Sequence, residues 1–209
     1  MEGHSNLAAQ QLAFTMKRLY LRGLISGIGG NASVRLSSDR ILITPSGYFK
    51  GGIAKGELVE VTLEGKIIRG KTPSSELQTH LIAYRKRRDI SAVVHGHPPT
   101  AVALITSGFE LKAVTPEHAA AVHKLQVVDF ATPGKEGADA VSKVLETCDV
   151  VGIKNHGFFA FAKTLHDAAS KIEVLEESAK IYIAMMQLGN VPILSDEQVA
   201  KIRAQYKKE

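Results

Sequence analysis

The chain has 209 residues, of which 44% are hydrophobic and 22% are charged, a composition that predicts one globular domain over residues 1–209 and excludes a disordered chain. The net charge of +5 includes one dense basic run, Arg85-Lys86-Arg87-Arg88, at the end of a predicted helix, where cations complement the helix dipole. No aromatic residue interleaves with this run to stack on bases, so we expect no nucleic-acid partner.

The single cysteine and the apolar pattern indicate the compartment. The first residues show no basic stretch followed by an apolar core, so we expect no signal peptide. No apolar run approaches the ~20 residues needed to span a bilayer, so we expect no membrane partner. The lone Cys148 excludes an internal disulfide and favours a reducing, cytoplasmic location.

The hydrophobic pattern predicts helices and short strands along the first half of the chain. They are a helix over 7–21, strands over 32–36 and 40–44, a hairpin of strands over 57–62 and 66–69, and a helix that follows 74–76 and runs to about 87. The stretch 24–33 is rich in glycine, and Pro45-Ser46-Gly47 forms a turn after the second strand. Ser75 with Gln78 fits a capping box, which satisfies free N–H groups at a helix start.

The second half of the chain continues this alternation. We expect a strand over 92–97, helices over 98–106 and 135–147, a strand over 127–130, two strands within 150–161, a long helix over 164–188, and a last short helix from 195 to about 206. Ser195 with Gln198 fits a second capping box. Because short strands arrive in groups, we predict a single α/β domain with a central, mostly antiparallel sheet flanked by helices.

A histidine pair marks the end of one predicted strand. His95 and His97 are separated by a single residue, and alternate side chains of a strand share a face, so both rings project to the same side. His156 follows a second apolar run at 150–153. Paired strand histidines often have only a structural role. Three histidines that leave one position open form a catalytic zinc site, however, so these three are the candidate ligands.

Three short motifs predict an anion-binding pocket. Residues 27–32 formally match the dinucleotide pattern G-x-G-x-x-A, but a helix precedes them and no acidic residue follows at the required distance, so we exclude a dinucleotide. Glycines and the amide of Asn31 still allow close approach to an anion. The stretches 44–47 and 74–75 add hydroxyl and N–H groups, the latter at a helix start. Each motif alone is typical of an ordinary turn, and together they indicate a phosphate pocket.

Glu76 directly follows the serine pair at 74–75, which places a carboxylate beside the predicted pocket. An acid in the first turn of a helix also interacts favourably with the helix dipole, which is the simple structural alternative. Beside a divalent metal, a carboxylate can act as a general base once substrate displaces it from the ion.

These motifs occur together in the class II aldolase/adducin family, which the chain resembles along essentially its whole length. The matching stretches are Gly30-Asn31-Ala32-Ser33, Thr44-Pro45-Ser46-Gly47, Pro73-Ser74-Ser75-Glu76, His95-Gly96-His97, Asn155-His156-Gly157 and Leu194-Ser195-Asp196-Glu197. Their order and spacing are similar to those of the bacterial sugar-phosphate aldolases of this family.

The resemblance implies a zinc-dependent aldolase, a carbon–carbon lyase that cleaves a small sugar phosphate through a metal-stabilised enediolate. It implies one Zn²⁺ per subunit on His95, His97 and His156, with Glu76 as a ligand at rest and as the catalytic acid/base. It also implies a homotetramer with active sites at subunit interfaces. The phosphate-binding positions that it implies are Gly30, Asn31, Ser46, Gly47, Ser74 and Ser75.

One departure from the family pattern concerns a tyrosine that a neighbouring subunit lends to the active site. The corresponding stretch here is 114–118, which contains no tyrosine. His118 is the candidate replacement for proton transfer, since histidine titrates near neutral pH, and an ordinary surface or interface histidine is the alternative. The histidines without such a context, expected to be structural or solvated, are His4, His80, His123 and His166.

Two further functions stay open. Within the same fold, an epimerase, dehydratase or decarboxylase could act on a phosphorylated sugar or sugar acid. In a different class, an adducin-like interaction module would have no catalytic activity. The complete set of three histidines and Glu76 argues against the module, because a scaffold needs no metal site.

Overall fold

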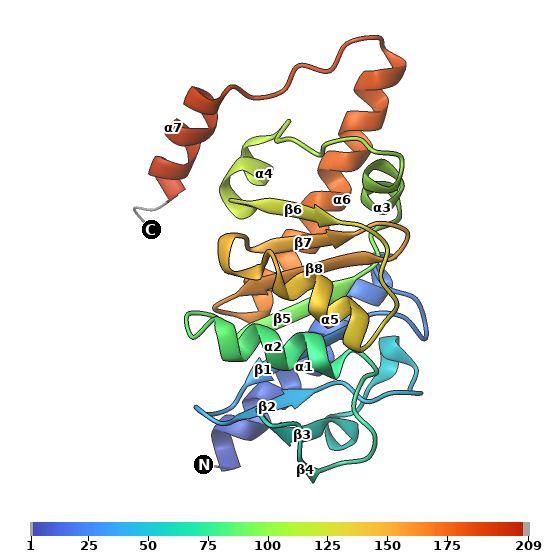
Figure 1. Ribbon diagram of the computed structural model, residues 1–209, viewed down its shortest axis with the longest axis vertical. Coiled ribbons are helices and arrows are strands. Elements are labelled where there is room, and N and C mark those ends of the chain that lie inside the picture. The colour runs from blue at the N-terminus through green and yellow to red at the C-terminus, as the bar shows by residue number, and fades with distance from the viewer. Residues whose placement is uncertain (1, 207–209) are drawn as a thin grey trace.

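The computed structural model describes residues 2–206, with side chains from Ser5, and eight strands in this range form one sheet in the order β4-β3-β2-β1-β5-β8-β7-β6 (Figure 1). Neighbouring strands run antiparallel except β6 and β7, which are parallel. The strands are β1 (Asn31–Arg35), β2 (Arg40–Ile43), β3 (Val59–Thr62), β4 (Ile67–Arg69), β5 (Ala92–Gly96), β6 (Leu125–Val128), β7 (Val150–Ile153) and β8 (Gly157–Ala162). The predicted mostly antiparallel sheet is confirmed, and its one parallel pair makes it a mixed sheet.

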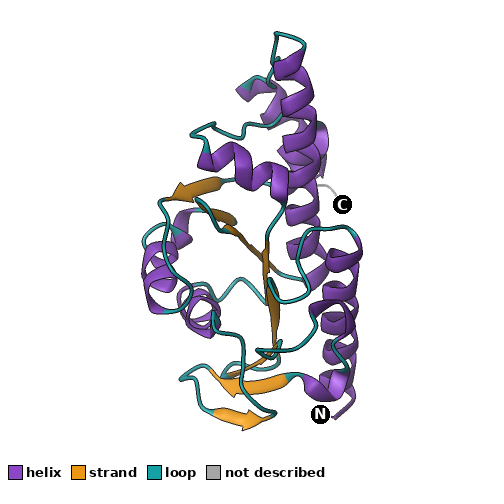
Figure 2. Cartoon of the chain, turned by 90° about the vertical axis from the view of Figure 1, so that its right-hand side faces the viewer, coloured by secondary structure: helices purple, strands orange, loops and turns teal. Residues whose placement is uncertain are grey.

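Helices cover both faces of this sheet (Figure 2). The helices α1, α3 and α6 pack on one face, and α2 and α5 pack on the other. The helices are α1 (Glu2–Leu21), α2 (Leu77–Lys86), α3 (Pro99–Thr106), α4 (Pro116–Ala121), α5 (Lys135–Ser142), α6 (Leu165–Gln187) and α7 (Asp196–Tyr206). Within the described range, no helix is both long enough and apolar enough to cross a membrane.

Strand alternation divides the core between the two faces. In β5, Val94 packs toward α1, α3 and α6, whereas Val93 packs toward α2 and α5. In β8, Phe158 and Phe159 divide in the same way. Because side chains of a strand alternate in direction, His95 shares the α2 face with Val93. This geometry places the histidine beneath the start of α2.

The two predicted capping boxes had different outcomes. The second is confirmed: the Ser195 backbone N–H donates to Gln198 Oε1 over 2.8 Å, and the Gln198 N–H donates to Ser195 Oγ over 3.2 Å. The first is wrong, because Glu76 is the N-cap of α2 and makes no side-chain cap bond. Ser74 accepts the Glu76 N–H instead, so the chain turns into the helix one residue later than the Ser75 box requires.

Several predicted boundaries also shift. The first helix starts at Glu2 rather than residue 7, and β6 starts two residues earlier than predicted. The predicted helix 135–147 is interrupted after α5, and a 3₁₀ turn covers Leu145–Thr147. Val141 and Leu145 are both buried, and this spacing of four residues resembles a continuous helix. The six residues of α4 are too few to show a helical period, so the pattern did not predict it. The expectation for His4 lies outside the described side chains.

Candidate metal centre and active site

Three imidazole rings meet where β5 ends and β8 begins. His95 lies in β5, His97 follows the strand directly, and His156 precedes β8. Their ligand-capable nitrogens lie within 4.8 Å of one another, and the Nε2 atoms of His95 and His97 are 2.8 Å apart. The structure therefore brings together all three histidines selected from the sequence, although β5 ends one residue earlier than predicted.

Burial and one backbone contact prepare His95 to bind a metal. Its Nδ1 donates to the Phe158 carbonyl over 3.0 Å, which leaves the Nε2 lone pair facing the other two rings. Its ring stacks on Phe159 with 4.1 Å between the ring centroids. Burial lowers the pKa of His95 well below its ordinary value and lowers the pKa of His97 to about 4. Both rings are therefore neutral at pH 7, as metal ligands must be.

Glycines and a left-handed turn provide the space for these rings. A Cβ on Gly29 would lie 2.8 Å from the His97 ring, and a Cβ on Gly157 would lie 2.5 Å from His97 Cδ2. Asn155 has a φ of 57°, a left-handed conformation that asparagine tolerates, and forms the turn that delivers His156. A larger residue at either glycine would displace the His97 ring.

Glu76, at the start of α2, completes the cluster. Its Oε2 lies 3.1 Å from His95 Nε2, and its Oε1 lies 3.5 Å from His156 Nε2. The side-chain amide of Asn31 donates to Oε2 over 2.7 Å. Burial raises the pKa of Glu76 to about 7, although the Asn31 hydrogen bond opposes this shift. A carboxyl group with a pKa near neutrality can both take up and return a proton at that pH.

This donor set fits a divalent transition metal. Three imidazole nitrogens and one carboxylate are ligands that zinc commonly takes in catalytic sites. His95, His97 and His156 would hold the ion, and Glu76 would be the fourth ligand in the absence of substrate. The histidines lie at the ends of two strands, and Glu76 lies at the start of a helix. The ion would therefore link the sheet to the helix that packs on it.

Two of the predicted anion-binding loops lie side by side. Pro45 and Pro73 form an isolated antiparallel bridge, and the adjacent Ser46 and Ser74 each donate a backbone N–H across the gap over 3.0 Å. Ser74 Oγ also accepts the backbone N–H of Glu76 over 3.3 Å. The residues of these loops that stay exposed are Ser46, Gly47 and Ser75. The exposed serines and glycine therefore lie next to the start of α2.

The remaining two predicted pocket residues, Gly30 and Asn31, support the histidine cluster. Asn31 is buried, and its Oδ1 accepts from His80 Nε2 over 2.6 Å while its Nδ2 donates to Glu76. Gly30 has a φ of +85°, and a Cβ there would lie 2.4 Å from Ile25 Cγ2, so only glycine fits. A role of these two residues in binding phosphate stays a prediction.

Lys50 was not predicted from the sequence, and it is buried beside the first serine loop. Its Nζ donates to the Pro45 carbonyl, and its backbone N–H donates to the Gly27 carbonyl over 2.8 Å. Burial lowers the pKa of the Lys50 ammonium group. Lys50 thus connects the glycine-rich loop to the serine loop. It begins a short 3₁₀ turn, Lys50–Gly52, outside every motif, so no local pattern could have identified it.

His118 lies apart from the histidine cluster of its own chain. It is buried in α4, where the charges that affect it are those of Arg203 and Asp149. Asp149 precedes β7 and His156 follows it, so the two mark opposite ends of that strand. The structure therefore does not bring His118 together with Glu76 within one chain, and its predicted catalytic role is not tested.

His118 should make the stability of the protein depend on pH. Burial lowers its pKa to about 4, so between pH 6.5 and pH 4 the unfolded chain binds a proton at this site that the folded chain does not. Stability therefore falls as the pH falls through this range, by up to about 3 kcal/mol from this group. We expect a His118→Leu variant to show a shallower loss of unfolding free energy in acid than the wild type. Parallel curves for the two proteins would contradict this assignment.

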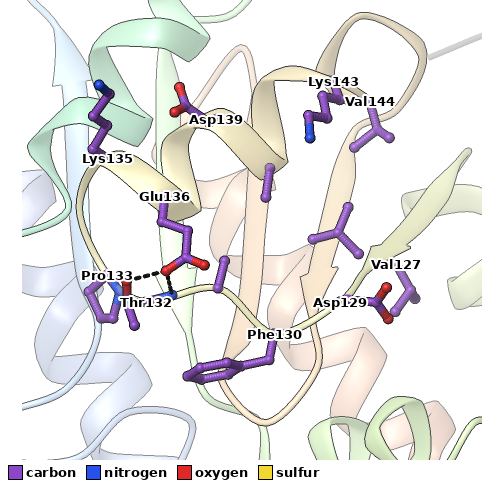
Figure 3. Close-up of a pocket in the computed structure, with 13 residues that line it drawn as sticks. Val127, Asp129, Phe130, Thr132, Pro133, Lys135, Glu136, Asp139, Lys143 and Val144 are labelled. Carbon is purple, nitrogen blue, oxygen red and sulfur yellow. Dashed lines mark hydrogen bonds between the residues drawn. The ribbon is translucent and has the colours of Figure 1, made fainter.

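A pocket of about 840 Å³ lies between β6 and α5 (Figure 3). Its lining includes Val127 and Phe130 on the strand side and Lys135 on the helix side. Glu136 accepts the backbone N–H of Thr132 over 2.9 Å at its mouth. The pocket has none of the histidines, Glu76 or serine-loop residues in its wall, so it is not a candidate for the same chemistry.

Comparison with known proteins identifies the family. The model of the Class II Aldolase and Adducin N-terminal domain matches residues 10–183. The chain belongs to the class II aldolase and adducin family. The L-fuculose phosphate aldolase of Methanocaldococcus jannaschii is 40% identical over 166 residues, which cover 79% of this chain and 90% of that protein.

Two further members of the class II aldolase and adducin family bear on fold and chemistry. A solved L-fuculose 1-phosphate aldolase matches with a TM-score of 0.88 at 33% identity over 96% of each chain. The 3-oxo-tetronate 4-phosphate decarboxylase of Haemophilus influenzae is 32% identical over 202 residues, which cover 93% of this chain and 96% of that protein. The fold expected from the sequence is thus confirmed, and the relatives of this chain include aldolases and a decarboxylase.

Proposed function

We propose that this chain is a zinc-dependent aldolase, a carbon–carbon lyase that cleaves a small sugar phosphate. The observation that carries the proposal is the meeting of His95, His97 and His156 with Glu76, at the N-terminal end of the helix that follows the serine loops. Membership in the class II aldolase and adducin family supports lyase chemistry. A non-catalytic module of the adducin type would not require converging metal ligands.

Each group has a separate task in this proposal. The three histidines would hold one Zn²⁺ per chain, which would supply Lewis-acid polarisation of the substrate carbonyl. The hydroxyl groups of Ser46 and Ser75 and the backbone N–H groups of Gly47 and Ser75 bind the phosphate, so that its binding energy orients the reacting end of the sugar. Glu76 moves a proton at a carboxylate oxygen, for which its raised pKa prepares it.

The alternative is an epimerase, dehydratase or decarboxylase of the same family. The decarboxylase of Haemophilus influenzae supports it, because that relative covers nearly the whole chain. The stretch 114–118 also supports it, since it lacks the tyrosine of the aldolase pattern. We therefore expect weak or no activity on fuculose 1-phosphate itself. A ketose phosphate with another C4 configuration, or an acid that loses CO₂, is the preferred substrate.

A screen of ketose phosphates for aldehyde release, with and without a chelator, tests the proposal. We expect release from at least one compound, abolished by the chelator and restored by added Zn²⁺. A parallel assay for CO₂ release from phosphorylated sugar acids distinguishes the alternative. A protein that binds no metal and is inactive in both screens would contradict both functions and leave the interaction module.

The phosphate group of the substrate should be essential for efficient turnover. Two or more hydrogen bonds to a dianion, each worth about 1.5–3 kcal/mol, predict at least a ~10²-fold lower kcat/KM for the unphosphorylated sugar. Because the exposed donors in the serine loops are neutral, binding should weaken only mildly with salt. The comparison requires kcat/KM for both forms of any active compound. Equal values for the two forms would show that the loops are ordinary turns.

We also propose a homotetramer with active sites at subunit interfaces. The end of α6 supports an interface, because Met186 and the adjacent Leu188 are 36% and 86% exposed. Tyr182 and Ile183 pack only partly against the core. Light scattering should give a mass of about 90 kDa, four times the 22.5 kDa of one chain. A monomeric mass, with activity retained on dilution, would exclude a shared site.

A further inference from the structure

A chain of hydrogen bonds runs from Glu76 into the core between β1 and α2. Asn31 Nδ2 donates to Glu76 Oε2 over 2.7 Å, and His80 Nε2 lies 2.6 Å from Asn31 Oδ1. Ser33 Oγ lies 2.6 Å from His80 Nδ1 and 2.9 Å from the Tyr84 hydroxyl. All five side chains are buried. We call this series the Tyr84–Glu76 relay.

The relay follows from two periodicities that match. Glu76, the N-cap of α2, and His80 and Tyr84 within the helix lie at intervals of four residues. Strand β1 contributes Asn31 and Ser33 at an interval of two. Four residues of α-helix advance about 6 Å and two residues of strand advance about 6.6 Å. The two sets therefore stay in step, and side chains from the helix and the strand alternate along the relay.

The chemistry of the groups gives the relay one direction. Asn31 faces a carboxylate, so it must present its NH₂ group there and its carbonyl oxygen to His80. His80 then donates from Nε2, and because burial lowers its pKa to about 3, its Nδ1 carries no proton and accepts from Ser33. The Ser33 oxygen accepts in turn from the Tyr84 hydroxyl. Each link donates toward Glu76, and hydrogen bonds aligned in this way polarise one another.

We propose that His80 is a positioning residue of the active site, which holds the Asn31 amide with its NH₂ group toward Glu76 and so keeps the Glu76 carboxylate in one orientation beside His95. Ser33 and Tyr84 are the outer links that hold His80 in its tautomer. The proposal rests on the proposed function only for its effect on catalysis. Without the His80 donor, the buried Asn31 carbonyl oxygen has no hydrogen-bond partner, so the amide can shift out of line and Glu76 loses its anchor.

Matched variants of His80 test this proposal. His80→Met keeps the approximate volume without a donor, whereas His80→Gln can place an amide NH₂ near the former Nε2. We expect His80→Met to lower kcat about 10–100-fold, the loss typical of residues that orient metal ligands, with KM changed less than about twofold. His80→Gln should recover most of the loss. Tyr84→Phe, which removes the outermost donor, should lose less than about threefold.

A core variant away from the relay controls for simple destabilisation. Leu104, in α3, is buried on the other face of the sheet, so Leu104→Ala lowers the melting temperature without touching the relay. If His80→Met loses no more kcat than Leu104→Ala, or if His80→Gln is no better than His80→Met, the positioning role is overturned. If His80→Met does not fold, Ser33→Ala provides the same test, because it removes the hydroxyl that donates to His80.

Crystal structures of the wild type and His80→Met separate this inference from the proposed function. If the wild type cleaves none of the ketose phosphates, the function fails, but the structures still decide the role of His80. We expect the Asn31 amide or the Glu76 carboxylate to leave its wild-type position in His80→Met, while His95 and His97 stay in place. Unchanged positions of Asn31 and Glu76 would overturn the inference.

Discussion

A His97→Ala variant is expected to purify with almost no bound metal, whereas the wild type should carry about one Zn²⁺ per chain. The physical reason is that His97 supplies one of three neutral nitrogens that converge at the end of β5. The fold should survive, because His97 lies outside the strand and its backbone N–H still donates to the Leu24 carbonyl over 2.7 Å. Metal analysis by mass spectrometry and circular dichroism of the same sample check both parts.

An exposed histidine provides the control for this experiment. His123 lies on the surface and contacts the Ala120 carbonyl through its ring, so His123→Ala should retain the full metal content. The assignment of the ligands would fail if a variant lacking both His95 and His97 still bound stoichiometric zinc. Loss of metal in His123→Ala as well would show that folding, rather than ligation, controls the metal content.

Glu76→Gln should retain the metal and lose ~10²–10⁴-fold in kcat, the range that general acid–base catalysis contributes. The amide is nearly isosteric with the carboxylate, and its oxygen can still accept the hydrogen bond that Asn31 donates to Glu76. The amide cannot take up a proton, however, so the proton-transfer step is lost selectively. Steady-state kinetics on the substrate found in the screen, together with metal analysis, measure the effect.

An exposed glutamate is the matched control for Glu76. Glu177 lies on the outer surface of α6, and Glu177→Gln should leave kcat unchanged. A Glu76→Gln variant with near-normal turnover would show that another group moves the proton, and His118 of a neighbouring chain would be the first to examine. A variant that loses its metal together with its activity would assign Glu76 a ligand role without the proton transfer.

Element types were predictable because they depend on local periodicity. The long helix α6 and the strands β1 and β2 follow directly from apolar spacing, and Ser195 with Gln198 forms its predicted cap. Failures occur where one local pattern fits two structures. Val141 and Leu145 have helical spacing but lie on either side of a break, and a six-residue helix such as α4 has too few residues to show a period.

The sequence by itself determined the candidate ligands. His95 and His97 lie two positions apart on one chain segment, His156 follows a second apolar run, and Glu76 follows a serine pair. The resemblance to the class II aldolase and adducin family then implies a role for each of them. These residues carry strong local patterns, and the structure places them within contact of one another.

The environment of these ligands was decided only by the tertiary structure. His80 stands in no metal-binding motif, and it joins the site because β1 lies under α2 with Asn31 and Ser33 facing the helix. The burial of His118 and Lys50 likewise depends on segments distant in sequence, which contain Arg203 and Gly27 respectively. The physical reason is that the periods of a helix and a strand indicate which residues share one face of that element. They do not indicate which other element packs on that face. The hydrogen bonds, burial and pKa values of the side chains follow from that packing.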